Sequence, residues 1–83
     1  MYYVYVLFSL KDQGLYIGQT KDLGVRVKQH NQGKVKSTKS RMPLELLYWK
    51  EVNTRVDALK LENEWKTTAG RRKLRKLLRH KLK

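Results

Sequence analysis

The chain has 83 residues, enough for one small hydrophobic core but not for two, so it is expected to form a single domain over residues 1–83. It has no cysteine, and its longest apolar run, residues 4–8, is far shorter than the roughly 20 residues of a membrane span. Disulfide and zinc-thiolate scaffolds are thereby excluded, and a reducing cytoplasm is expected. The formal net charge of +13 predicts a polyanionic partner: nucleic acid, anionic lipid or acidic protein.

The first two predicted elements form a β-hairpin. Residues 2–8 are β-branched or aromatic almost throughout and apolar on both alternating faces, which is typical of a central strand covered on both sides. The turn-forming residues 11–14 then lead into a second run, residues 15–18. We expect Gly18 to end this second strand, and the two runs to pair antiparallel.

A helix capped by Thr20 or Asp22 is predicted to run to about Asn31. Within it, Arg26 and His30 are four residues apart, so they lie on the same side, at the margin of the apolar stripe. Such a pair could hold a phosphate between a guanidinium and a titratable imidazole, or it could simply be a solvated helix edge.

Residues 34–42 are almost entirely polar and predict a surface loop, and residues 44–52 predict a third strand. Thr54 is expected to cap a second helix that runs to about Lys66. Glu62 falls inside the apolar arc of this helix, where a carboxylate costs several kcal/mol unless it is paired, protonated or bound to a metal. The alternative is that Glu62 lies at the edge of the arc and pairs with a lysine.

Gly70 is expected to break the chain before a basic amphipathic helix over residues 71–83, where four leucines recur among eight basic residues and no acid. The predicted order is therefore β-β-α-β-α-α. This order predicts an α/β fold of the α+β type, a small three-stranded, mostly antiparallel sheet flanked by helices.

Two tyrosines on the predicted hairpin also attract attention. Tyr5 and Tyr16 lie on neighbouring strands and could bring two phenol groups into one cleft, or they could be ordinary strand aromatics.

Taken together, these residues resemble a known family. Tyr3-Val4-Tyr5, Tyr16-Ile17-Gly18, Arg26 with His30, and Glu62 occur in the order and spacing of the GIY-YIG nuclease superfamily, and the chain is most similar to its small stand-alone members. The same domain forms an incision module of bacterial excision repair and the head of some homing endonucleases. The resemblance extends from about residue 2 to residue 72.

The resemblance implies a Mg²⁺-dependent (or Mn²⁺-dependent) endonuclease acting on DNA, in repair or recombination. It implies that the catalytic residues are Tyr5, Tyr16, Arg26, His30 and Glu62. Glu62 would hold one metal ion, Arg26 would clamp the scissile phosphate, and either tyrosine could be the base. Gly18 would let the backbone approach the substrate.

The remaining basic residues predict DNA binding through phosphates, with weak sequence preference. The candidates are Lys34, Lys36, Thr38, Lys39, Arg41, Arg71, Arg72, Lys73, Arg75 and Lys76. The asparagine that larger members place after the glutamate helix has no clear counterpart, so a non-catalytic nucleic-acid-binding module of the same fold is the alternative. A third interpretation makes the C-terminal helix an interfacial membrane or docking element. The sequence does not identify a subunit interface.

Overall fold

A computed structural model describes residues 1–79. The elements are β1 (Tyr2–Ser9), β2 (Leu15–Thr20), α1 (Leu23–Asn31), the short 3₁₀ helix η1 (Lys39–Arg41), β3 (Leu44–Val52), α2 (Arg55–Lys66) and α3 (Thr68–Leu78). Apart from η1, which lies within the predicted surface loop, this is the predicted order β-β-α-β-α-α in an α+β fold. No helix within residues 1–79 is long and apolar enough to cross a bilayer.

The three strands form one antiparallel sheet in the order β2-β1-β3, so β1 is the central strand, as predicted. In the β1–β2 hairpin Tyr5 pairs with Gly18 and Leu7 with Tyr16. The pairing of β1 with β3 shifts register between Val6 and Leu7. The hairpin register therefore sets both motif tyrosines and Gly18 side by side.

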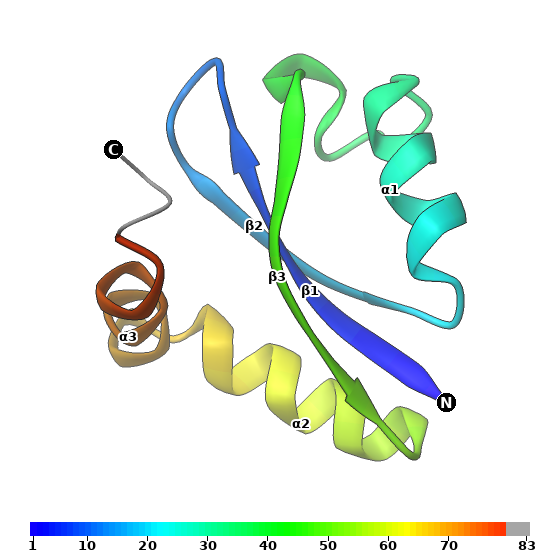
Figure 1. Cartoon of the computed structure of the whole chain (residues 1–83), viewed down its shortest axis with the longest axis vertical. Helices are drawn as coiled ribbons and strands as arrows, with labels where there is room; N and C mark the ends of the chain where they lie inside the picture. The colour runs from blue at the N-terminus through cyan, green and yellow to red at the C-terminus, as the bar shows by residue number, and fades with distance from the viewer. Residues whose placement is uncertain (80–83) are drawn as a thin grey trace.

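The sheet is covered on both faces, which explains why β1 is apolar on both alternating sets. Helix α1 lies against one face, and α2 and α3 lie on the other (Figure 1). On the α2–α3 side the buried core consists of Val4, Val6, Leu15, Ile17, Leu47, Ala58, Leu74 and Leu78. On the α1 side it consists of Tyr5, Leu7 and Leu44, with Tyr16, Leu23 and Val27 packed against it.

Two predicted element boundaries, each placed at a glycine, are wrong. Gly18 does not end its strand, because β2 continues to Thr20. Gly70 does not break the chain, because α3 begins at Thr68 with Thr67 as its cap, and Gly70 lies in the first turn. A Cβ at Gly70 would lie 2.0 Å from the Glu64 carbonyl oxygen, so this glycine permits the close approach of α3 to α2. Residues 80–83, the end of the predicted 71–83 helix, lie outside the described residues.

The helix caps are the ones that the sequence predicts. The Asp22 side chain accepts a hydrogen bond from the Val25 N–H, and the Thr54 hydroxyl accepts one from the Asp57 N–H. In α2, Leu59 is 50% exposed. The inward side of α2 is instead formed by Ala58, Leu61 and Trp65.

Candidate functional site

Tyr5 is at the centre of a polar cluster on the α1 face of the sheet. The side chain is buried, and its hydroxyl lies 2.8 Å from His30 Nε2. Gly18, its partner across the hairpin, leaves the space that the phenol occupies: a Cβ at Gly18 would lie 2.6 Å from the Tyr5 hydroxyl oxygen. Gly18 thus serves the packing of Tyr5.

His30 connects Tyr5 to the loop that follows α1. The sequence places His30 at the margin of α1, but it is the one fully buried residue of that helix. Its Nδ1 lies 2.7 Å from the Thr38 hydroxyl oxygen. The prediction that Thr38 contacts DNA from a surface loop is wrong, because Thr38 is buried and faces the imidazole.

Burial also sets the protonation states of this cluster. Burial raises the pKa of Tyr5 to about 12, although a hydrogen bond from the Arg26 side chain opposes the rise. Burial and the nearby charge of Arg26 lower the pKa of His30 to about 4. At neutral pH, Tyr5 is therefore a neutral phenol and His30 a neutral imidazole.

Tyr16 lies beside this pair but is more accessible. Its ring centroid is 6.4 Å from that of Tyr5 and 5.1 Å from that of His30, and the side chain is only half-buried. The Ser37 hydroxyl oxygen lies 3.5 Å from the Tyr16 hydroxyl oxygen. Tyr16 is thus the phenol that substrate or water can reach without moving the buried pair.

Arg26 brings a fixed positive charge to the same place. It is half-buried on α1, with Nη1 3.3 Å from the Gln29 side-chain oxygen. Its hydrogen bond and its charge both lower the pKa of Tyr5, and its charge lowers that of His30. The structure therefore brings together Tyr5, Tyr16, Arg26 and His30, as the sequence analysis expects.

Glu62 reaches the site from the other side of the sheet. Its side chain is 13% exposed, one oxygen accepts a 2.9 Å hydrogen bond from the Gln19 amide of β2, and the other forms an ion pair with Lys66. Its charge contributes to the raised pKa of Tyr5. The pairing with a lysine agrees with the alternative interpretation of Glu62, although the carboxylate is not at a fully solvated edge.

The donor set for a metal ion is small. Within residues 1–79 no three His, Asp or Glu side chains cluster in a way that could hold a metal. A single carboxylate with water and phosphate oxygens suits Mg²⁺, which retains most of its hydration shell. Glu62 supplies a carboxylate of this kind, and a metal ion there would compete with the Lys66 ammonium that it already binds.

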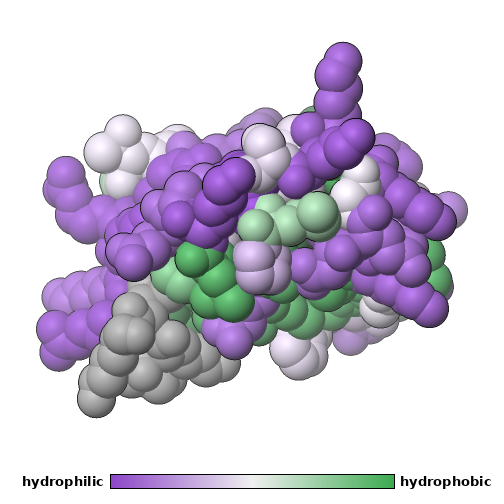
Figure 2. All heavy atoms as spheres, turned by 90° about the horizontal axis from the view of Figure 1, so that it is seen from above, coloured by the Kyte–Doolittle hydropathy of each residue, from purple (hydrophilic) through white to green (hydrophobic). Residues whose placement is uncertain are grey.

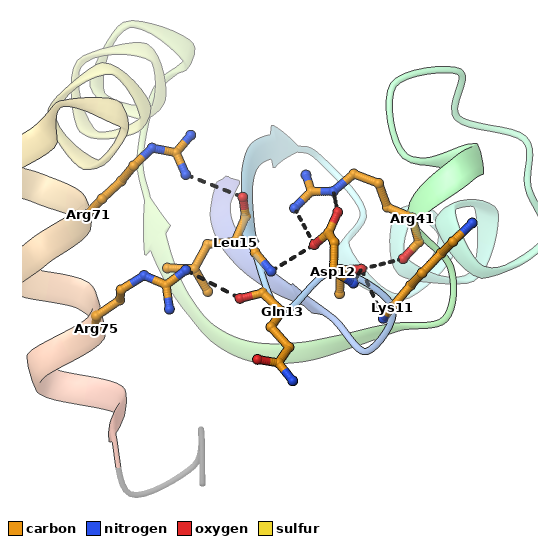
Figure 3. Close-up of polar contacts among 9 residues, drawn as sticks. Lys11, Asp12, Gln13, Leu15, Arg41, Arg71 and Arg75 are labelled. Atoms are coloured by element: carbon orange, nitrogen blue, oxygen red, sulfur yellow. Dashed lines mark hydrogen bonds and ion pairs between the residues drawn. The ribbon is translucent and has the colours of Figure 1, made fainter.

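The predicted DNA-binding cations divide into paired and unpaired ones. Arg41 forms an ion pair with Asp12, while Arg71 donates to the Leu15 carbonyl and Arg75 to the Gln13 carbonyl (Figure 3). These contacts hold the β1–β2 turn between α3 and the η1 loop. The exposed candidates that make no such contact within residues 1–79 are Lys34, Lys36, Lys39, Arg72, Lys73 and Lys76. Hydrophilic side chains cover most of the face seen from above Figure 1, with a smaller apolar area between them (Figure 2).

Three residues contact His30 or Glu62 although the sequence does not predict these contacts. Thr38 was assigned to DNA, and neither Gln19 nor Lys66 was singled out. Lys66 carries a usable signal, because it follows Glu62 at the i, i+4 spacing of helical ion pairs. Gln19 and Thr38 act across the fold, through contacts 43 and 8 residues away, and only the folded structure reveals them.

Known proteins with similar sequences identify the family to which these site residues point. The sequence model of the GIY-YIG catalytic domain matches residues 1–75. A UPF0213 protein of Staphylococcus epidermidis is 43% identical over 75 residues, which cover 89% of this chain and 90% of that protein. A UPF0213 protein of Staphylococcus aureus is 41% identical over the same shares of both chains. No solved structure matches.

Proposed function

The chain belongs to the GIY-YIG family, and on that premise we propose that it is a cytoplasmic, divalent-metal-dependent endonuclease that hydrolyses phosphodiester bonds in DNA. One observation carries this proposal. The Tyr5–His30 hydrogen bond, the accessible Tyr16 phenol and the Arg26 guanidinium meet on one face of the sheet, and the charge of the Glu62 carboxylate on α2 contributes to the raised pKa of Tyr5.

Arg26 is the residue proposed to bind the scissile phosphate. Hydrolysis of a phosphodiester increases negative charge on the phosphate oxygens, and a forked guanidinium can donate two hydrogen bonds to them. The hydrogen bond of Arg26 Nη1 to the Gln29 side-chain oxygen holds the guanidinium before substrate arrives, which reduces the ordering needed on binding.

Tyr16 is proposed as the group that takes the proton from the attacking water. Tyr5 is the weaker candidate because its pKa of about 12 keeps it protonated and its hydroxyl is engaged with His30. A phenol acts as a base only after it has lost its own proton, and nearby cations favour the phenolate.

Glu62 would hold the metal ion, one per site, with Gln19 orienting its carboxylate. When bound, Mg²⁺ or Mn²⁺ would supply additional positive charge to the phosphate and to the leaving oxygen. Glu62 would have to give up its ion pair with Lys66 to take the ion, because the two cations compete for one carboxylate.

The exposed lysines of the η1 loop and the outer face of α3 are proposed to contact DNA phosphates. Because such contacts read charge and shape rather than bases, we propose structure-directed binding with weak sequence preference, as needed in repair or recombination. The ion pair that neutralises Glu62 also favours a second candidate, a DNA-binding module that does not cleave.

A cleavage assay tests the proposal. Labelled linear, single-stranded, flap and four-way DNA would be incubated with Mg²⁺ or Mn²⁺ and either wild type, Glu62→Ala or Glu64→Ala. Glu64 is an exposed carboxylate on the same helix and makes no ion pair within the described residues, so it is a matched control. Metal-dependent cleavage that only Glu62→Ala abolishes supports the nuclease. Binding without cleavage by the folded wild type supports the binding module.

A further inference from the structure

The hydrogen bonds behind Tyr5 run from α1 into the loop before η1. Tyr5 Oη lies 2.8 Å from His30 Nε2, and His30 Nδ1 lies 2.7 Å from Thr38 Oγ1. The Thr38 oxygen in turn lies 3.4 Å from the Val35 carbonyl oxygen. Tyr5, His30 and Thr38 are all buried, so none of these groups can exchange its partner for bulk water.

The direction of donation along these hydrogen bonds follows from counting donors and acceptors. A neutral imidazole donates from one nitrogen and accepts at the other. If Nδ1 carries the hydrogen, it donates to Thr38, Thr38 donates to the Val35 carbonyl, and Tyr5 donates to Nε2. Every hydrogen in the chain then has an acceptor, and the Tyr5 oxygen remains free to accept from Arg26.

The opposite direction leaves a defect. If Nε2 carries the hydrogen, Tyr5 must accept from both His30 and Arg26. Its own hydroxyl hydrogen then has no acceptor among the contacts of the described residues, in a buried position where an unsatisfied donor is destabilising.

We propose that Thr38 is a positioning residue, which fixes the Nδ1–H tautomer of His30 and thereby turns the hydroxyl hydrogen of Tyr5 toward Nε2. The effect on cleavage rests on the proposed function, but the tautomer does not. Through these hydrogen bonds the loop orients the Tyr5 phenol without touching the substrate.

The backbone around Thr38 supports this role. Its N–H donates to the Val35 carbonyl, and its carbonyl accepts from the Arg41 N–H, so the residue is held on both sides as the cap of η1. Val35 is itself buried, which anchors the turn against the body of the protein. Thr38 is therefore rigid enough to dictate the imidazole tautomer.

The test is a long-range ¹H–¹⁵N NMR correlation of the His30 ring in the full chain, on wild type, Thr38→Ser and Thr38→Val. The His30→Gln variant identifies the signals, because the chain has two histidines. We expect hydrogen on Nδ1 in wild type and Thr38→Ser, and a shift toward hydrogen on Nε2 in Thr38→Val. Hydrogen on Nε2 in wild type, or an unchanged tautomer in Thr38→Val, would overturn the proposal.

Cleavage kinetics supply the second readout. Thr38→Val is expected to lower kcat by about tenfold or more with KM nearly unchanged, and Thr38→Ser to restore it. A kcat for folded Thr38→Val equal to that of wild type would refute the positioning role. If Thr38→Val does not fold, the proposal is still tested by the tautomer of His30 in wild type and by the kcat of Thr38→Ser. A tautomer as expected in a protein that never cleaves would refute the nuclease proposal instead.

Discussion

Tyr5 and Gly18 are paired across the hairpin, and the phenol of Tyr5 fills the space that a side chain at position 18 would take. A Cβ there would lie 2.6 Å from the hydroxyl oxygen and 2.8 Å from the ring carbon that bears it. The glycine of one motif is thus explained by the tyrosine of the other. The polar cluster depends on this fit, because it fixes the Tyr5 hydroxyl 2.8 Å from His30.

Gly18→Ala is therefore expected to displace Tyr5 and to lower the free energy of unfolding by about 1 to 3 kcal/mol, as overpacking does. Gly24→Ala is the control, since the nearest atom to its Cβ is the Asp22 carboxylate oxygen at 3.9 Å. It should stabilise the helix by ~0.5 to 1 kcal/mol. Urea unfolding measures the free energy of unfolding of both variants. A Gly18→Ala variant as stable as Gly24→Ala would show that Tyr5 does not need this space.

The buried imidazole predicts a pH dependence of stability. The pKa of His30 is lowered to about 4 in the folded state, from about 6.5 in the unfolded chain, so the unfolded state binds more protons between these values. The His30 contribution to the free energy of unfolding should be fully present above pH 6.5. The free energy of unfolding should fall by on the order of 2 kcal/mol as pH drops toward 4. His30→Asn should remove that slope in urea unfolding at several pH values. A slope identical to that of wild type contradicts burial of a neutral His30.

Competition at Glu62 predicts how metal affinity responds to mutation. Lys66→Gln should raise the affinity for Mn²⁺ several-fold, because the carboxylate loses a competing cation, and Glu62→Gln should abolish binding. Lys60→Gln removes the same charge from the same helix without touching Glu62 and is the control. Electron paramagnetic resonance of free Mn²⁺ measures the three variants. Equal affinities of Lys66→Gln and Lys60→Gln would exclude direct competition.

The division of the basic residues predicts different salt dependences. The double substitution Arg72→Gln/Lys76→Gln removes two exposed cations of α3 and should reduce the slope of log affinity against log salt by about 2. Arg71→Gln should instead lower the free energy of unfolding by about 0.5 to 1 kcal/mol, because Arg71 bonds the Leu15 carbonyl. Fluorescence anisotropy with labelled DNA and urea unfolding separate the two effects. A slope unchanged in the double variant would remove α3 from the DNA-binding surface.

Much of the fold could be predicted because each element has a local signal. Apolar residues on both alternating faces mark β1 as central, and Asp22 and Thr54 mark the helix starts. Gly70 was misassigned because sequence cannot distinguish a glycine that ends a helix from one that admits a neighbouring backbone. His30 was placed at a margin because the periodicity of one short helix does not reveal what packs above it.

The candidate site could be predicted as a set of residues but not as a network. Tyr5, Tyr16, Arg26 and His30 carry recognisable spacing, and the structure brings them together. Thr38 looks like a loop hydroxyl among lysines, and only tertiary contact reveals that it faces an imidazole. Likewise, Tyr5 is buried and Tyr16 only half-buried, a difference that two similar strand positions do not disclose.

The most direct test of the central claim is single-turnover cleavage of the preferred DNA substrate with Mg²⁺ by wild type, Arg26→Ala and Lys28→Ala. Both substitutions remove one positive charge from α1, but Lys28 is exposed and lies outside the polar cluster. We predict that Arg26→Ala lowers the cleavage rate about 10² to 10³-fold with DNA affinity nearly retained, and that Lys28→Ala cleaves like wild type. Equal rates for the two variants, or no cleavage by a folded wild type, would contradict a phosphodiesterase site built around Arg26.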